Sequence, residues 1–284
     1  MRRHAVCFAA GLMVAAASVW HGATLAYATE PDAAASVAAG AVTVTSGMIA
    51  PTSSRDRQRL VVIGDSVGAN LADGLKWAFR RSKIIKVSKR TKAGTGLARP
   101  DVYNWPRALR RVVRRERPDI LVLLIGGNDR QDMRHKGRRY ERFSKPWSRE
   151  YVRRLERFAD QLEESGAQIF WIGLPNVRSA RMTRDYHRFN AWVRKAARAR
   201  GQRFIPIRHL FETNGGGYSA YGRSVRGKRV RLRSRDGIHM SRHGSYLMGR
   251  YVAQEIMSDL PARIVGTASA KRAEAARRKD RKVQ

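Results

Sequence analysis

The sequence predicts an α/β fold, a three-layer α/β/α sandwich with a central parallel sheet. Short apolar segments alternate along the chain with longer segments whose apolar residues recur at helical spacing. Residues 120–125 are continuously apolar, which is typical of a strand buried on both faces. An alternation of this kind implies parallel strands joined by helices that cover both faces of the sheet.

Five segments are predicted to be strands because they are short and mainly apolar, and because turn residues or charged residues bound them. In chain order they are residues 59–63, 84–87, 119–125, 168–172 and 203–207. The segment at 84–87 is the shortest of the five, so its prediction rests on the fewest residues.

Five longer segments are predicted to be helices. In the first of them, Leu71, Leu75 and Phe79 share one face. The second is strongly basic on its polar side, and Pro118 ends it. The five segments are residues 69–79, 105–116, 148–164, 183–197 and 244–257.

Polar or glycine-rich motifs follow three of the predicted strands, and a fourth motif precedes the last helix. Gly-Asp-Ser at 64–66 follows the first strand, Ala-Gly-Thr-Gly-Leu at 93–97 follows the second, and Gly-Gly-Asn-Asp at 126–129 follows the third. Asp-Gly-Ile-His at 236–239 precedes the last helix. Because ligands of open parallel sheets bind beyond the carboxyl ends of the strands, we expect these motifs to form one site.

The order and context of the motifs GDS, GGND and DGIH resemble those of the SGNH (GDSL-type) hydrolase family, and the resemblance covers most of residues 59–258. It implies the sandwich described above with a flavodoxin-like strand order. It also implies ester hydrolysis through an acyl-enzyme, without a metal or a cofactor. The sequence departs from the family pattern in two places. Val67 replaces the usual leucine after GDS, and residues 93–97 lack the residues that usually flank the family's second motif.

By this resemblance Ser66 is the nucleophile, His239 the general base and Asp236 the group that orients the histidine. The chemistry needs these residue types, since a serine hydroxyl is a weak nucleophile and requires a base. An imidazole can take the proton near neutral pH, and a carboxylate fixes its tautomer. Asp236 and His239 lie three residues apart, so one tight turn can place both beside Ser66.

The resemblance also implies an oxyanion hole, that is, donors that stabilise the negative charge on the attacked carbonyl oxygen. The expected donors are the backbone N–H of Ser66, the backbone N–H of Gly96 and the side-chain amide of Asn128. Gly94 lies in the same motif as Gly96, and the choice between the two glycines stays open.

The same residues allow other interpretations. Residues 64–68 also fit the G-x-S-x-G elbow of α/β-hydrolases, although here Ser66 follows the first core strand and the acid and base share one turn. A purely structural alternative is that Ser66 caps a helix. His239 and His243 have the spacing of paired metal ligands, but no glutamate follows His239 as in H-E-x-x-H, so we expect no metal.

Residues 214–235, directly before the DGIH motif, are long, glycine-rich and basic. One interpretation is a solvated excursion of the chain. The other is a rim that gathers a sugar-containing or anionic substrate through stacking and charged hydrogen bonds. The predicted substrate-binding residues in that case are Tyr218, Tyr221, Arg229, Arg231 and Arg233.

The N-terminus predicts export. A basic head, Met1 to His4, precedes an alanine-rich apolar run, and Ala26-Tyr27-Ala28 fits a cleavage site. Residues 1–28 are therefore predicted to be a signal peptide cut after Ala28, with an uncleaved N-terminal anchor as the alternative. Cleavage would remove Cys7, the only cysteine, so the mature chain would form no disulfide.

The rest of the chain divides by composition. Residues 29–55 are predicted to be a flexible linker, residues 56–262 the hydrolase-like domain and residues 263–284 a basic tail. With the signal peptide, this organisation predicts a protein of the periplasm or cell envelope.

The charge of the chain is extreme: 58 Lys and Arg face 23 Asp and Glu, a formal net charge of +35. The electric field of so much positive charge is expected to attract anionic envelope polymers or membrane surfaces. The alternative is that the arginines reflect a compositional bias of the genome and have no such role. No motif for nucleic-acid recognition is visible, and we expect no nucleic-acid partner.

The sequence as a whole predicts an exported serine hydrolase that cleaves an O-acyl or O-acetyl ester on an envelope glycan or lipid. Two alternatives stay open. One is an O-acyltransferase that passes the acyl group to a cell-envelope polysaccharide, and the other is a non-catalytic, basic envelope-binding protein.

Overall fold

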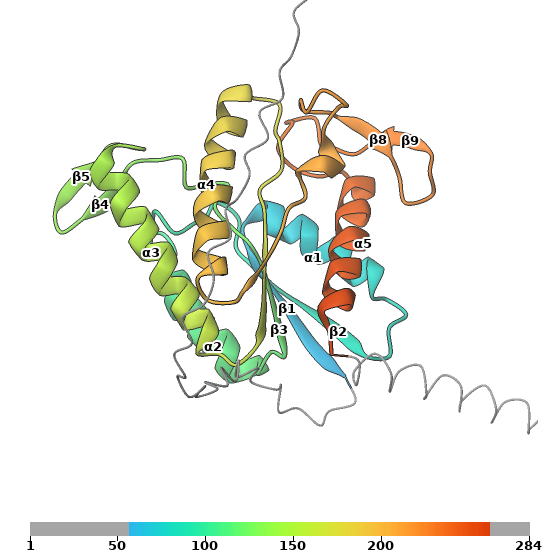
Figure 1. Cartoon of the computed structure of the whole chain (residues 1–284), viewed down its shortest axis with the longest axis horizontal. Helices are drawn as coiled ribbons and strands as arrows, with labels where there is room; N and C mark the ends of the chain where they lie inside the picture. The colour runs from blue at the N-terminus through green and yellow to red at the C-terminus, as the bar shows by residue number, and fades with distance from the viewer. Residues whose placement is uncertain (1–56, 262–284) are drawn as a thin grey trace, which may run out of the picture. The chain divides into compact units, whose positions relative to one another are not determined.

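The computed structural model describes residues 57–261 (Figure 1). The predicted signal peptide, linker and basic tail lie outside the described residues, so the structure does not test them.

The central sheet has five parallel strands in the order β2-β1-β3-β6-β7. They are β1 (Gln58–Gly64), β2 (Ile85–Thr91), β3 (Ile120–Leu124), β6 (Gln168–Ile172) and β7 (Arg203–Ile205). The first strand of the chain lies inside the sheet and the second lies at its edge, which is the flavodoxin-like order. The predicted fold class is therefore confirmed.

The edge strand β2 differs from its prediction, since it runs to Thr91 and not to residue 87. Its second half, Ser88 to Thr91, is polar and only partly buried. Charged residues are common on edge strands because they discourage pairing with another chain. Apolar patterning therefore could not reveal this half of the strand.

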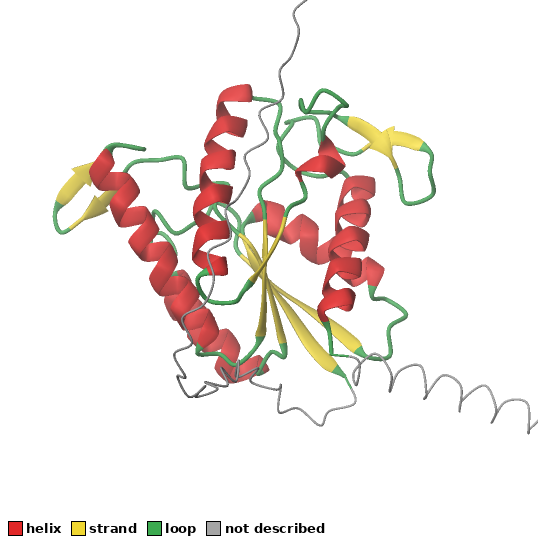
Figure 2. Cartoon of the chain, in the orientation of Figure 1, coloured by secondary structure: helices red, strands yellow, loops and turns green. Residues whose placement is uncertain are grey.

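Five helices cover the sheet, with α1 and α5 on one face and α2, α3 and α4 on the other (Figure 2). No helix among residues 57–261 has both the length and the hydropathy to cross a membrane. The helices are α1 (Ser66–Ala78), α2 (Trp105–Glu116), α3 (Lys145–Glu163), α4 (Ala180–Arg198) and α5 (Arg242–Asp259).

Four of the helices begin two or three residues before their predicted starts. In each case an N-cap side chain accepts a hydrogen bond from a backbone N–H of the first turn: Asp65 for α1, Ser144 for α3, Ser179 for α4 and Ser241 for α5. A cap sets the start of a helix by this bond, whereas hydrophobic periodicity first appears where the helix meets the core.

Helices α1 and α5 cross at two glycines. A Cβ atom on Gly249 would lie 2.0 Å from the backbone carbon of Gly74, and one on Gly74 would lie 1.9 Å from the carbonyl oxygen of Ser245. The two backbones therefore touch directly, and a residue larger than glycine at either position would prevent this close approach.

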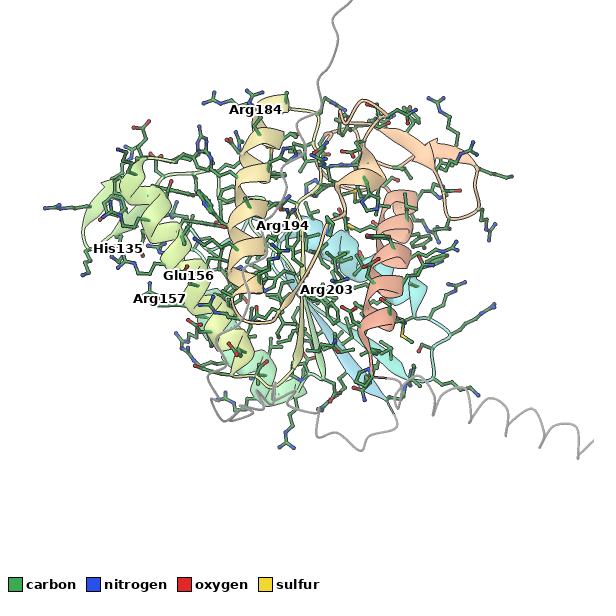
Figure 3. All side chains as sticks on the ribbon, viewed as in Figure 1. His135, Glu156, Arg157, Arg184, Arg194 and Arg203 are labelled. Carbon is green, nitrogen blue, oxygen red and sulfur yellow. The ribbon has the colours of Figure 1, made fainter. Side chains whose placement is uncertain are left out.

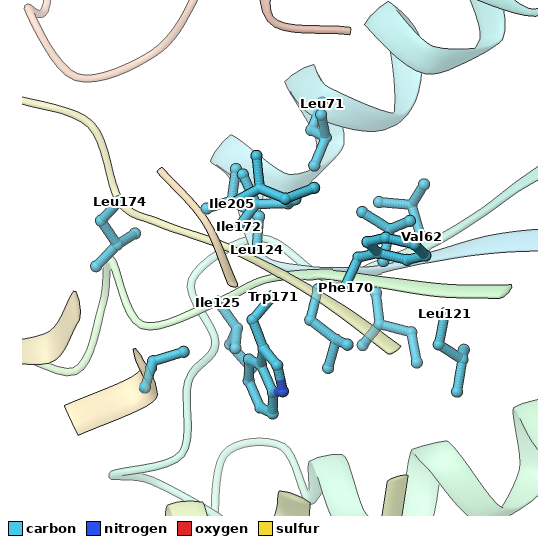
Figure 4. Packing of buried hydrophobic residues seen from close by; sticks show 14 of the residues in the cluster. Val62, Leu71, Leu121, Leu124, Ile125, Phe170, Trp171, Ile172, Leu174 and Ile205 are labelled. Carbon is cyan, nitrogen blue, oxygen red and sulfur yellow. The ribbon is translucent and has the colours of Figure 1, made fainter. Parts of the chain in front are cut away.

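The core lies between the sheet and its helices. All residues of β3 are buried, and in β1 only Arg59 is partly exposed. Val62, Leu121 and Phe170 of the central strands and Leu71 of α1 all belong to this core, with Leu121 on the opposite face of the sheet from Leu71 (Figure 4). A rigid sheet of this kind fixes the positions of the loops at its carboxyl edge.

Two hairpins lie outside the sheet and were not predicted. One joins β4 (Met133–His135) to β5 (Arg138–Tyr140), and the other joins β8 (Tyr221–Arg223) to β9 (Arg229–Arg231). Each strand has only three residues and contains at least one arginine, so hydrophobic alternation gives no signal. A short 3-10 helix, η1 (Arg208–Phe211), follows β7, which ends two residues before its predicted end.

Candidate active site

Ser66 is the first residue of α1 and follows directly on β1 through Asp65. The turn needs glycine on both sides. A Cβ atom on Gly64 would lie 2.0 Å from the carbonyl oxygen of Leu124, and one on Gly68 would lie 2.7 Å from the same oxygen. The G-x-S-x-G pattern thus has a local cause, because the end of β3 passes close beneath the turn that carries Ser66.

The DGIH loop brings Asp236 and His239 to this serine. His239 Nε2 lies 2.8 Å from Ser66 Oγ, and His239 Nδ1 lies 2.6 Å from Asp236 Oδ2. The carboxylate holds the proton on Nδ1, so Nε2 is free to accept the hydrogen bond of the serine hydroxyl. The structure brings together all three residues that the motifs singled out, and His243 takes no part in this chain of hydrogen bonds.

Asp236 is held as a carboxylate. Its partial desolvation raises the pKa, but the hydrogen bonds from the imidazole of His239 and from the backbone N–H groups of Ile238 and His239 outweigh this and lower the pKa of Asp236 to about 2. The group is therefore ionised throughout the pH range in which a histidine base works.

Asp65 joins two loops of the site. Its Oδ1 accepts from the N–H of Val67 at 2.9 Å and of Gly68 at 3.4 Å, while Oδ2 accepts from the N–H of Gly127 at 3.1 Å. The side chain is fully buried, and this burial raises its pKa to about 6 in spite of the three donors. Asp65 thus connects the turn around Ser66 with the GGND loop and lies too deep to contact a substrate.

Asp129 joins the GGND loop to the glycine-rich loop at 93–97 in the same way. Its carboxylate accepts from the N–H groups of Leu97 and Ala98, at 3.0 and 2.7 Å, and from the hydroxyl of Tyr151 at 2.9 Å. Burial raises the pKa of Asp129, and the group is wholly enclosed. The two aspartates therefore fix three loops of the carboxyl edge relative to one another.

Asn128 and the glycine-rich loop lie side by side. The side-chain amide of Asn128 donates to the carbonyl oxygen of Thr95 at 3.2 Å, which leaves its second N–H for another acceptor. In a trans peptide, the N–H of Gly96 lies on the opposite side from that carbonyl, so it points away from the Asn128 amide. This geometry weighs against Gly96, the glycine favoured from the sequence, as a donor that converges with Asn128.

The two glycines differ in their surroundings. Gly96 is buried, and a Cβ atom there would lie 2.0 Å from a carboxylate oxygen of Asp129, so it needs to be glycine for packing. Gly94 is exposed, has φ of +73° and has open space around the position of a Cβ atom. Its conformation favours glycine without any packing reason.

Arg233 was predicted to contact substrate, and this prediction is wrong. Arg233 is completely buried, and its guanidinium donates to the carbonyl oxygens of Asn176 and Ile238, both at 2.6 Å. The rings of Phe211 and Tyr218 flank it, with centroids at 5.2 and 5.3 Å. Burial lowers its pKa to about 10. Arg233 supports the DGIH loop from below and has no surface to offer a substrate.

The other predicted rim residues lie on or before the β8–β9 hairpin. Tyr221 is 47% exposed, and the guanidinium groups of Arg229 and Arg231 both lie 5.6 Å from its ring centroid. Tyr218 instead packs inward against Arg233, and its hydroxyl oxygen is buried. The structure thus gathers an exposed aromatic ring and two cations in one place, without Tyr218.

Sequence reasoning missed Asn70, which holds the DGIH loop against α1. Its Oδ1 accepts from the backbone N–H of Met240 at 3.0 Å, one helical turn from Ser66. Its position one turn beyond the nucleophile is a signal that the sequence contained. In the part of the chain that the structure describes, no group of three or more His, Cys, Asp or Glu side chains is placed to hold a metal ion.

Solved structures that are similar to this chain include a lipase and an esterase. A GDSL-like lipase from Bacteroides thetaiotaomicron is 14% identical, with a TM-score of 0.52 over 72% of this chain and 89% of that chain. The acetyl xylan esterase AlAXEase is also 14% identical, with a TM-score of 0.50 over 72% of this chain and 100% of that chain. At such identities the likeness concerns the fold, which is that of the SGNH (GDSL-type) hydrolases.

This fold confirms the predicted resemblance. A search of the curated proteins finds no significant match. Residues 59–255 match the model of the family described as "Protein of unknown function (DUF459)", and since this match covers more than half of the chain, the protein belongs to that family.

Proposed function

We propose that this protein is a serine hydrolase that cleaves an ester bond, with Ser66 as the nucleophile. The observation that carries the proposal is the continuous chain of hydrogen bonds from Ser66 Oγ through the imidazole of His239 to Asp236, with atoms 2.8 and 2.6 Å apart. A serine that only capped a helix would not need a histidine and a carboxylate in this order.

In the first step the Ser66 hydroxyl attacks the ester carbonyl carbon while its proton moves to His239 Nε2. The imidazolium that forms is stabilised by the ionised Asp236. The tetrahedral intermediate then collapses, the bond to the alcohol breaks, and His239 returns the proton to the leaving alkoxide. The products of this step are the free alcohol and an ester of Ser66.

In the second step His239 takes a proton from water, and the resulting nucleophile attacks the acyl-enzyme. Collapse of this second intermediate releases the carboxylic acid and restores the Ser66 hydroxyl. The negative oxygen of both intermediates needs donors, for which we propose the N–H of Ser66, the free N–H of the Asn128 amide and an N–H of the glycine-rich loop other than that of Gly96.

For the substrate we propose an O-acyl, most simply O-acetyl, ester on a glycan or lipid of the cell envelope. The open position of the site supports a bulky substrate, since the side chains of His239 and Asp236 are 36% and 44% exposed. One fold neighbour is an acetyl xylan esterase, which supports an acetylated polysaccharide. The basic head, apolar run and small-residue cleavage site at 1–28 support export to the periplasm or envelope.

Acyl transfer to a polysaccharide hydroxyl would use the same acyl-enzyme, and no contact in the described residues favours a sugar over water as the acceptor. A non-catalytic envelope-binding protein would have no need for the Ser66–His239 contact. Hydrolysis is therefore the function that we put forward.

The test compares hydrolysis of p-nitrophenyl acetate by wild type, Ser66→Ala and Ser88→Ala. We expect Ser66→Ala to lower kcat by roughly 10⁴-fold or more, because the nucleophile and its base act as one unit. Ser88 lies on the edge strand β2 and serves as the matched control, with activity equal to wild type.

A fluorophosphonate probe gives a second readout, because it labels an activated serine covalently. Mass spectrometry of a digest should find the label on Ser66 alone. Equal hydrolysis by wild type and Ser66→Ala, together with an unlabelled Ser66, would refute the proposal.

A further inference from the structure

We propose that helix α2 and the two hollows beside it form a binding track for an acidic polysaccharide. Helix α2 carries five arginines and one glutamate among its 12 residues. The arginines are all exposed; they are Arg107, Arg110, Arg111, Arg114 and Arg115. The glutamate, Glu116, is paired with Arg90 of β2, and within residues 57–261 none of the five arginines of α2 forms an ion pair.

This arrangement is unfavourable for the isolated helix. Arg107, Arg111 and Arg115 follow one another at intervals of four residues, and like charges at this spacing destabilise a helix. The first turn of α2 contains no acidic residue that would offset the repulsion. A bound polyanion would remove this repulsion, and it would do so along the whole length of the helix.

A hollow lies on each side of α2. The first, of about 480 Å³, lies between α2 and α3, and Arg110, Arg154 and Arg157 are among the residues that line it. The second, of about 720 Å³, lies between α2 and the edge strand β2. Its cationic lining residues are Lys89, Arg90, Arg111 and Arg115. Tyr103 and Trp105 line both hollows, so the two meet at the N-terminal end of α2.

Part of this positive charge is already neutralised within the protein. In the first hollow, Glu150 is paired with Arg154 at 2.8 Å. In the second, Asp73 is paired with Lys89 at 3.0 Å, and Glu116 with Arg90. The cations that are left for a ligand are therefore mainly the arginines of α2 itself. We call α2 and the two hollows the arginine track.

The shape of the track favours a chain-like polymer over a membrane. Side chains that end in nitrogen project all around the outline of the described residues in this view, so charge alone selects no face (Figure 3). The hollows do select one, since a single polymer strand can enter them and the plane of a bilayer cannot. Among the described residues only Val102 and Tyr221 are large, hydrophobic and exposed, which offers little to a lipid surface.

The aromatic residues of the track favour a glycan over a nucleic acid. Proteins that bind single-stranded nucleic acids stack bases on exposed aromatic rings. Here Trp105 is 2% exposed and Tyr103 packs edge-on against it, with ring centroids 4.8 Å apart. Carboxylate groups spaced along a sugar chain need only the arginines, each of which can bind a carboxylate through two N–H groups.

The track leads to the loop that we propose contributes to the oxyanion hole. Gly96 and Leu97 line its first hollow, and the indole N–H of Trp105 donates to the hydroxyl of Thr95 at 3.1 Å. A polymer held on α2 would thus present its acyl groups near Ser66. This link to the substrate rests on the proposed hydrolase function, whereas binding of the polymer does not.

The experiment measures binding of de-esterified oligogalacturonate to the full chain by calorimetry at low salt, with neutral dextran as the uncharged control. The variant Arg111→Gln/Arg115→Gln removes two charges from α2. The matched control, Lys195→Gln/Arg198→Gln, removes two charges from the last turn of α4, where both side chains are also exposed. Glutamine is a good helix former, so both variants should fold.

We expect the α2 variant to bind oligogalacturonate about tenfold more weakly, because charged hydrogen bonds are lost, and the α4 variant to bind as wild type does. If both variants bound oligogalacturonate equally weakly, net charge alone would explain the binding, and the proposal would be overturned. A larger loss of binding by the α2 variant to duplex DNA or to phosphatidylglycerol vesicles than to oligogalacturonate would also overturn it. Because the probe carries no ester, a failure here is distinct from a failure of the hydrolase proposal.

Discussion

At the scale of single residues, Asp65 shows how the site is organised at a cost in stability. Its carboxyl group is fully buried, and the hydrogen bonds that it accepts among the described residues come from backbone N–H groups. Its two oxygens serve different loops, one capping α1 and the other holding Gly127. A carboxylate can accept on both sides at once, which neither an amide nor an apolar side chain can do.

A pH dependence follows from Asp65. Its pKa of about 6 in the folded chain lies above the ordinary value of 3.8, so the chain folds more favourably with Asp65 protonated than with Asp65 ionised. The associated stability is present below pH 4 and is lost as the pH rises through 6, by about 3 kcal/mol in total. Urea unfolding of wild type and Asp65→Asn between pH 4 and 7 should show wild type losing stability relative to the variant. A constant difference between the two would contradict the raised pKa.

Arg233 acts through the loop that carries the base. Its bond to the carbonyl oxygen of Ile238 lies next to His239, so its loss should let the imidazole move away from Ser66. We expect Arg233→Met to lower kcat on p-nitrophenyl acetate roughly 10–100-fold, since small displacements of catalytic groups are costly. Arg233→Lys should recover part of the loss because it restores one donor and the charge. If both variants unfold at lower temperature yet keep the wild-type kcat, Arg233 stabilises the fold without positioning His239.

The residues of the site differ in how far the sequence revealed them. The motifs GDS and DGIH contain Ser66, Asp236 and His239, residue types that are typical of a serine hydrolase site. Arg233 stands in a run of basic residues, and nothing local distinguishes it from its exposed neighbours Arg229 and Arg235. Its burial depends on Phe211 and Tyr218, which pack on it from separate segments.

At the scale of secondary-structure elements, the crossing of α1 and α5 sets the distance between the two segments that carry Ser66 and the DGIH loop. Ser66 begins α1, and α5 starts three residues after His239. Gly74 and Gly249 let the two helices touch.

A single methyl group at this crossing should therefore disturb it. We expect Gly249→Ala to lower the free energy of unfolding by about 1–3 kcal/mol, because the Cβ atom would overlap the backbone of Gly74. Gly215→Ala is the control, since a Cβ atom there meets nothing closer than 4.0 Å. Urea denaturation measures both variants, and a neutral effect of Gly249→Ala would show that the helices can separate at no cost.

Helices and strands could be predicted from the sequence where their apolar residues are buried in the core. The strand 168–172 and the helix 105–116 have the predicted bounds, since their apolar residues face the core along their whole length. The β4–β5 and β8–β9 hairpins escaped prediction because their strands have three residues each and every strand contains an exposed arginine. Their geometry comes from turns and packing, and hydrophobic periodicity carries no information about either.

At the scale of the whole molecule, the described residues contain a complete hydrophobic core and all residues of the candidate site. A domain with its own core folds as a unit. We therefore expect a fragment of residues 57–261 to unfold cooperatively and to hydrolyse p-nitrophenyl acetate at the rate of the full chain. Circular dichroism and the ester assay test this expectation. A fragment that folds but has lost activity would mean that segments outside 57–261 contribute to the site.

The chain order of the five sheet strands and the five long helices could be predicted from the sequence, because burial in the core leaves a local hydrophobic pattern. The candidate catalytic chemistry could also be predicted, because the GDS, GGND and DGIH motifs resemble those of the SGNH (GDSL-type) hydrolases. The tertiary structure was needed to show that Ser66 and His239, 173 residues apart, lie within hydrogen-bond distance. It alone decided that Arg233 is enclosed and that the charge of α2 borders two hollows. Contacts of this range depend on strand order and on which helix covers which face, and no local segment of the chain specifies either.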